Sequence, residues 1–187
     1  REDVPVFAMV TRMTEQKGFD LVERMLDELM QYNDMQFFML GSGDKEYESF
    51  MREAEARYKG RLCAYIGYNE ELSHCVYAGA DFLLMPSRFE PCGLSQMIAM
   101  RYGTLPIVRE TGGLKDSVKP YNKFTGEGTG FSFADFNAHE MKDAMLLALD
   151  CYKNPVVMSS LVRQAMEADF SFDRSSEEYA MLYLWML

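Results

Sequence analysis

Long apolar runs, paired cysteine motifs and an excess of basic residues are all missing from this sequence of 187 residues. No apolar run approaches the roughly 18 residues that suggest a membrane span, so no membrane partner is expected. The formal net charge of −10 argues against nucleic acid as a partner, because binding its backbone needs a basic stripe. A small anion pocket is still compatible with this charge, since local charge decides there.

The four cysteines form no CxxC pair and fit no zinc template; they are Cys63, Cys75, Cys92 and Cys151. With no signal peptide or cysteine-rich framework, reduced cytosolic thiols are the default expectation. The sequence also lacks a phosphate-binding P-loop, an HExxH motif and any Asp-x-Asp pair that could anchor a metal-chelated diphosphate. The turn at Gly41 begins like a dinucleotide fingerprint, but Glu46 occupies the third glycine position. We therefore expect no metal and no separate cofactor.

What is present is a regular alternation of apolar runs and helical patterns. Strands are predicted at 4–10, 35–40, 62–66, 82–85 and 105–108, with a last edge strand at 131–133. Helices are predicted after Gly18 and at about 44–58, 70–80, 93–102 and 112–118. This order predicts an α/β fold, a Rossmann-like parallel sheet with helices on both faces.

The end of the chain departs from this alternation. Three consecutive helices are predicted at about 137–151, 154–168 and 173–186, the first opened by Asn137 and Glu140 as a capping box. We place a domain boundary between 1–153 and a helical tail at 154–187. The tail ends in an unusually apolar stretch around Trp185, which either packs on its own domain or docks on a missing part. The chain begins without Met, and we expect it to be a piece of a larger protein.

Unusual residues gather where the predicted strands end. In open parallel sheets, ligands bind beyond the carboxyl ends of the strands. The turns there carry Arg12, Lys17, Gly41, Tyr68, Arg88, Glu90, Arg109 and further glycines. Gly93 and the pair at 112–113 are predicted to open helices, whose free N–H groups suit phosphate. Any one such turn is more simply explained as a tight connection, but basic, glycine-rich turns on one rim favour a phosphate site.

Individual side chains on this rim allow two interpretations. Glu90 is either a first-turn glutamate that suits the helix dipole or a carboxylate that contacts sugar hydroxyls or a charged anomeric carbon. Tyr68 is either a core residue or a stacking surface for a purine. His74 and His139 have no partner pattern, and we interpret both as surface or packing residues.

Four segments resemble one known family. The stretches at 11–18, 86–96, 101–118 and 170–173 are similar to the bacterial and plastid starch and glycogen synthases, and the likeness covers about residues 4–187. The resemblance implies the C-terminal half of a two-domain enzyme of GT-B architecture, located in the bacterial cytoplasm or plastid stroma. Residues 1–153 would bind the nucleotide sugar, and the helices at 154–187 would pack toward a missing N-terminal domain.

The resemblance also implies a reaction and a set of site residues. Glucose would pass from ADP-glucose to the non-reducing end of an α-1,4-glucan, with retention and without metal. Arg12 and Lys17 would hold the diphosphate, Glu90 would line the glucose, and all three would act in catalysis. The remaining donor-binding residues implied are Gly41, Tyr68 for adenine, Cys92, Gly93 and Leu94 for glucose, Ser95 for the distal phosphate, and Thr111, Gly112 and Gly113.

One position departs from a wider pattern. Many retaining enzymes of this architecture carry a second Glu eight residues after the first, and here that position is Ile98. Its absence favours the starch and glycogen synthases and argues against a scheme with two carboxylates in this loop. Two alternatives stay open: another transferase of this architecture that uses a UDP-sugar, and a non-catalytic module that binds glucan or a partner protein.

Overall fold

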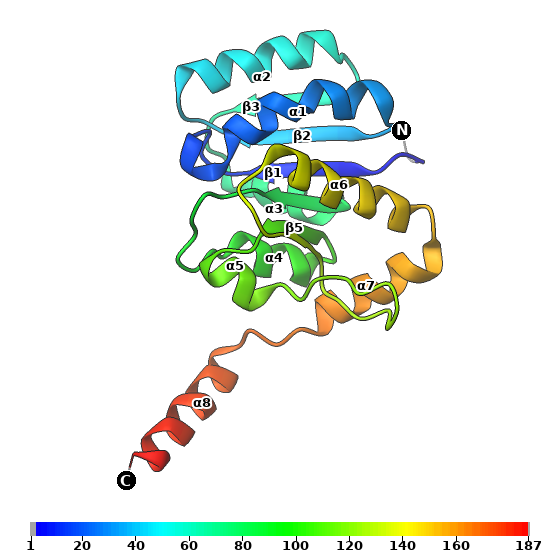
Figure 1. Cartoon of the computed structure of the whole chain (residues 1–187). Helices are drawn as coiled ribbons and strands as arrows, with labels where there is room; N and C mark the ends of the chain where they lie inside the picture. Colours follow the sequence, from blue (N-terminus) through cyan, green and yellow to red (C-terminus); the bar gives the residue numbers. More distant parts are fainter. Residues whose placement is uncertain (1–2, 187) are drawn as a thin grey trace.

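The chain forms a six-stranded parallel sheet with helices packed around it (Figure 1). The computed structural model describes residues 3–186, so the outer limits of the predicted domains at 1 and 187 lie outside it. The strands are β1 (Val6–Val10), β2 (Gln36–Gly41), β3 (Leu62–Ile66), β4 (Phe82–Met85), β5 (Leu105–Arg109) and β6 (Phe131–Phe133). Their order across the sheet is β3-β2-β1-β4-β5-β6, and every neighbouring pair is parallel.

Four of the helices begin at a residue whose side chain accepts a hydrogen bond from the first turn. The helices are α1 (Phe19–Tyr32), α2 (Lys45–Arg57), α3 (Glu70–Gly79), α4 (Ser95–Tyr102), α5 (Gly112–Ser117), α6 (Ala138–Tyr152), α7 (Pro155–Glu167) and α8 (Phe172–Trp185), with a short 3-10 turn η1 (Glu15–Lys17). The side chain of Asn137 accepts hydrogen bonds from the first turn of α6. The predicted capping box is wrong in its second half, because Glu140 accepts from the N–H of Asp135 and not of Asn137.

Alternating strand side chains bury both faces of the sheet. In β1, Phe7 and Met9 are fully buried among residues of α1 and α6, while Ala8 between them faces α3 and α4. This alternation explains why the strands are apolar along their whole length, as expected for a parallel sheet covered on both sides. The predicted α/β class with helices on both faces is confirmed.

The strand order also fixes where a ligand can bind. The chain runs outward from β1 through β2 to β3, then crosses back to place β4 on the other side of β1. The loops after β1 and β4 therefore leave the sheet in opposite directions and open a crevice between them. This is the end of the sheet at which the sequence gathers its unusual residues.

The last two helices behave differently from each other. α7 packs on α4, α6 and β5, and it buries Leu161 and Ala165. α8 buries no residue and extends away from the body (Figure 1), with Trp185 87% exposed. The apolar end thus does not pack on its own domain, and docking of 154–187 on another domain stays a prediction. Between residues 3 and 186, no helix is long and apolar enough to cross a bilayer.

Asp81 ties β1 to β4 at the amino end of the sheet. The N–H of Val6 donates to Asp81 Oδ2 at 2.8 Å. Burial raises the pKa of this carboxyl above its ordinary 3.8, although the bond from Val6 acts in the opposite direction. The folded protein therefore holds the Asp81 proton more tightly than the unfolded chain does. This contribution to stability is present below pH 3.8 and is lost as the pH rises through the raised pKa.

Two substitutions of Asp81 distinguish the effect of its buried charge from the effect of its hydrogen bond. Asp81→Asn keeps an acceptor for Val6 and removes the buried charge, so we expect it to be at least as stable as the parent at about pH 7 and to lose that advantage near pH 3.5. Asp81→Ala leaves the Val6 N–H unpaired and should lose about 1–3 kcal/mol. Thermal unfolding at both pH values measures this. Equal destabilisation of the two variants at neutral pH would contradict the assigned role of the charge.

Candidate functional site

Two loops meet beyond the ends of β1 and β4. Gly18 has φ of 77°, and a side chain at this position would overlap the carbonyl oxygen of Pro86. Next to this contact, the N–H of Arg88 donates to the carbonyl of Gln16 at 2.8 Å. Only glycine permits both the left-handed backbone and the close approach. The two loops therefore form one fixed surface.

An ion pair joins the same two loops. Lys17 Nζ donates to Glu90 Oε2, and the two side chains are only 17% and 12% exposed. Ser87 Oγ donates to the same oxygen at 3.3 Å. Within residues 3–186, the other oxygen of Glu90 has no hydrogen-bond partner. The resemblance assigns Lys17 to the diphosphate and Glu90 to the glucose, whereas the structure places the two side chains in direct contact.

Two arginines at the carboxyl end of the sheet, Arg88 and Arg109, make contacts with other residues of the domain. The Arg88 guanidinium pairs with Glu15 at 2.6 Å and lies 4.3 Å from the centre of the Phe136 ring. Arg109 Nε donates to the carbonyl of Ser87 at 2.9 Å, and its Nη2 donates to the carbonyl of Arg88. Both guanidinium groups are therefore occupied by contacts within the domain.

Arg12 differs from the other rim cations. It is exposed at the end of β1, and no carboxylate or other acceptor between residues 3 and 186 engages its guanidinium. A cation without an internal partner remains available for a ligand.

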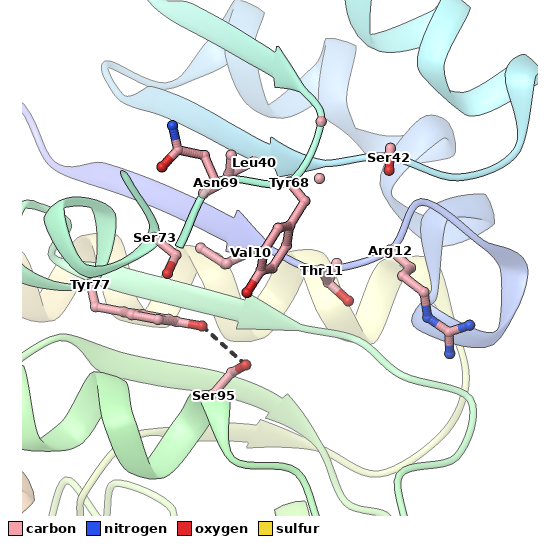
Figure 2. A pocket seen from close by; sticks show the side chains of 12 residues that line it. Val10, Thr11, Arg12, Leu40, Ser42, Tyr68, Asn69, Ser73, Tyr77 and Ser95 are labelled. Atoms are coloured by element: carbon pink, nitrogen blue, oxygen red, sulfur yellow. Dashed lines mark hydrogen bonds between the residues drawn. The ribbon is translucent and has the colours of Figure 1, made fainter. Parts of the chain in front are cut away.

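A cavity of about 300 Å³ lies beside Arg12, beyond the ends of β1 and β2 (Figure 2). It is lined by Val10, Thr11, Arg12, Leu40, Gly41, Ser42, Gly67, Tyr68, Asn69, Ser73, Tyr77 and Ser95. Figure 2 shows Tyr68 reaching over the cavity from the loop after β3, while Tyr77 points from α3 toward Ser95. Tyr68 is 85% exposed, so the interpretation of this residue as core is wrong and its ring is free to stack.

The cavity brings together four of the site residues predicted from the sequence, namely Arg12, Gly41, Tyr68 and Ser95. Lys17 and Glu90 pair in the adjoining loops. Cys92 and Leu94 lie exposed in the segment that leads from Glu90 to α4. Gly93 was predicted to open that helix, but α4 begins at Ser95. The fully buried side chain of Gln96 holds this segment, since Nε2 donates to the carbonyls of Cys92 and Gly93 at 3.2 and 3.0 Å.

The start of α5 lies against the loop that carries Glu90. Thr111 precedes this helix of six residues without capping it through its side chain, and Gly113 N donates to the carbonyl of Glu90 at 3.1 Å. Side chains at Gly112 and Gly113 would overlap the carbonyl oxygens of Glu90 and Cys92. The expectation of a free donor is therefore wrong for Gly113. Close packing of two backbones explains both glycines.

Several lining residues were not predicted from the sequence. Asn69 caps α3, and its position in the loop between β3 and α3 is the one signal that could have revealed it. Ser73 and Tyr77 lie one turn apart on α3, where an amphipathic helix pattern gives no sign of a cavity. In the described part of the chain, no cluster of three His, Cys, Asp or Glu side chains is arranged to hold a metal ion. Donor binding without metal stays a prediction.

The family model for glycosyl transferases group 1 matches residues 1–164, and the chain belongs to this family. It is 54% identical over 182 residues to the glycogen synthase of Geobacillus thermodenitrificans, covering 97% of this chain and 37% of that protein. It is 53% identical over 183 residues to the glycogen synthase of Bacillus anthracis, covering 98% of this chain and 38% of that protein.

A solved structure agrees with these relatives. The catalytic domain of starch synthase IV from Arabidopsis thaliana, bound to ADP and acarbose, superposes with a TM-score of 0.86 at 34% identity. The match covers 98% of this chain and 38% of that chain. The predicted resemblance to starch and glycogen synthases is thus confirmed. The chain spans little more than a third of the length of these relatives.

The contact between Lys17 and Glu90 predicts coupled stability. Lys17→Met and Glu90→Gln each leave one largely buried partner without its counterpart, so each should lose about 1–3 kcal/mol of unfolding free energy. The double variant should lose less than the sum, with a coupling of about 1 kcal/mol or more. Urea unfolding of the parent and the three variants measures this coupling.

The pair between Lys153 and Asp150 is a matched control, because both of its side chains are 73% exposed. Its coupling should stay below about 0.5 kcal/mol. An equally small coupling between Lys17 and Glu90 would show that their contact does not join the two loops.

Proposed function

We propose that this chain is the nucleotide-sugar-binding domain of a glycogen or starch synthase that uses ADP-glucose. The complete enzyme would transfer glucose, with retention, to the non-reducing end of an α-1,4-glucan. We place it in the bacterial cytoplasm or the plastid stroma. The observation that carries the proposal is one cavity with a free aromatic face at Tyr68 and an uncommitted cation at Arg12.

The base of a nucleotide fits the Tyr68 side of the cavity. An exposed ring in the loop after β3 offers a flat apolar face, and stacking of a base on such a ring contributes about 1–3 kcal/mol. Asn69 and Ser73 line the same side with polar groups that can contact the edge of a base or a ribose. The ADP bound to the Arabidopsis starch synthase supports adenine as this base.

The diphosphate fits the Arg12 side. A guanidinium with no internal partner can form charge-assisted hydrogen bonds, each of about 1.5–3 kcal/mol. Ser95 adds a hydroxyl at the first turn of α4, where the helix dipole favours negative charge. We propose that Arg12 and Lys17 stabilise ADP as it departs, without a metal ion.

The sugar fits the loop that carries Glu90. The free oxygen of its carboxylate can accept hydrogen bonds from glucose hydroxyls or stabilise positive charge that develops at the anomeric carbon. The contact with Lys17 fixes this carboxylate in position. The exposed loop residues Cys92 and Leu94 leave one side of this region open. We propose that the acceptor glucan binds there, between this domain and an N-terminal domain of the same enzyme.

Calorimetric titration of the chain with ADP and, separately, with UDP tests the donor. We expect ADP to bind more tightly, and Arg12→Ala to weaken ADP binding by about tenfold or more, on the order of one lost charge-assisted hydrogen bond. Arg24→Ala is the matched control, because Arg24 is also exposed but lies on α1 away from the cavity. Its affinity for ADP should not change.

Other results of this titration distinguish the alternatives. Equal or tighter binding of UDP would assign the chain to a transferase that uses a UDP-sugar. If neither nucleotide binds, the same titration on the full-length protein decides between a site completed by a second domain and a module that is no transferase.

The catalytic part of the proposal concerns turnover. In the full-length enzyme, Arg12→Ala should lower kcat by about a hundred- to a thousandfold, because it removes a preorganised charge from the leaving group. Incorporation of glucose into glycogen from ADP-glucose measures this, with Arg24→Ala as the control again. Turnover close to that of the parent would refute the phosphate role of Arg12.

A further inference from the structure

Tyr77 has a buried ring and a hydroxyl that reaches the cavity. The residue is 5% exposed, and its ring packs in the small cluster between the sheet and helices α3 and α4, with Leu83 and Ala99 among its neighbours. The backbone carbonyl of Tyr77 accepts a hydrogen bond from the buried hydroxyl of Thr104. The ring and the backbone of Tyr77 are therefore both fixed, so the hydroxyl at the end of the ring can adopt few other positions.

The Tyr77 hydroxyl is hydrogen bonded to the side chain of Ser95. Its Oη donates to Ser95 Oγ at 3.1 Å, the dashed line in Figure 2. Burial raises the pKa of Tyr77 above its ordinary 10, so the phenol keeps the proton that it donates at neutral pH. Among residues 3–186, this is the one hydrogen bond made by the Ser95 side chain. The proton of the serine hydroxyl is thus left without an acceptor.

The direction of this bond determines what Ser95 can do. A hydroxyl that accepts a hydrogen bond on one side has its own proton confined to the remaining directions. Tyr77 approaches from the α3 side of the cavity, and Ser95 itself lines the cavity. A hydroxyl that accepts one bond is also polarised toward donating the next one. Ser95 is therefore prepared to donate to an acceptor in the cavity.

We propose that Tyr77 is a positioning residue that fixes the Ser95 hydroxyl as a hydrogen-bond donor to a phosphate group of the bound nucleoside diphosphate. This inference rests on the proposed function, because it requires a nucleoside diphosphate in the cavity. It adds a neutral, preoriented donor to the charge of Arg12. Tyr77 itself makes no contact with the phosphate.

A double-variant cycle in nucleotide binding tests the inference. Tyr77→Phe keeps the ring and its packing but removes the hydroxyl, and Ser95→Ala removes the donor. Each variant should weaken ADP binding roughly three- to tenfold, the range of one neutral hydrogen bond. The double variant should bind ADP no more weakly than Ser95→Ala alone. Adenosine, which lacks phosphate, should bind the parent and all three variants equally.

Tyr58→Phe is the matched control. It also removes a phenol hydroxyl that is hydrogen bonded, in this case to Asp27 on α1, away from the cavity. Its affinity for ADP should equal that of the parent, and thermal unfolding of every variant confirms that the fold is intact.

Different results contradict different claims. If the unchanged chain binds ADP but Tyr77→Phe binds it equally well, the positioning role is refuted and the proposed function stands. Additive losses in the double variant, or an equal loss of adenosine binding, would show that Tyr77 acts only as a wall of the cavity. Failure of both the unchanged chain and the full-length protein to bind ADP would instead contradict the nucleotide site on which the inference depends.

Discussion

The close approach of two loops at Gly18 is the constraint on which the site depends. Without a side chain at Gly18, the segment after β1 can lie directly on Pro86 at the end of β4. The backbone hydrogen bond from Arg88 to Gln16 then fixes the two loops relative to each other, and this places Lys17 against Glu90. On the other side, the N–H of Gly113 at the start of α5 donates a hydrogen bond to the backbone carbonyl of Glu90. Glu90 is thus held at its backbone by α5 and at its carboxylate by Lys17. A residue fixed in this way loses little entropy when it binds a sugar, which is the advantage of preorganisation.

Local and net charge have separate consequences in this chain. The sequence carries a net charge of −10, yet its rim holds Arg12, Lys17, Arg88 and Arg109. Arg88 and Arg109 are engaged by carboxylate, carbonyl and aromatic groups, and Lys17 is neutralised by Glu90. Within residues 3–186, Arg12 is the rim cation that no internal acceptor engages. A count of basic residues in the sequence therefore overstates the charge available to a ligand. Arg12 lies at a helix-bounded cavity, where a phosphate would be the acceptor that the domain itself does not provide. On the proposed function, Lys17 would contact the diphosphate while it also pairs with Glu90, so its charge would be shared.

The sequence predicts the sheet well because strand and helix periodicity are local properties. Apolar runs, three of them stopped by Gly or Pro-Ser, locate the strands, and the alternation then leaves few parallel topologies to consider. The rim follows, since parallel strands end on one side. What sequence reasoning missed depends on contacts between distant segments. Tyr77 resembles any buried helical residue until α3 is packed beside α4. Gly113 resembles a phosphate turn until its N–H meets the carbonyl of Glu90, 23 positions earlier. The exposure of Tyr68 likewise depends on where the loop after β3 lies.

Because the site is open on one side, we expect a nucleotide to bind this domain only weakly. Tyr68 is 85% exposed and Leu94 65%, so the aromatic face and the sugar loop are both in water on one side. Electrostatic attraction between Arg12 and a diphosphate is several times weaker in water than in a cavity from which water is excluded. A second wall would exclude that water and strengthen Arg12, Ser95 and the pair of Lys17 and Glu90 together. On the proposed function, the N-terminal domain supplies this wall, so closure of the cleft would raise the contribution of every one of these groups without moving them.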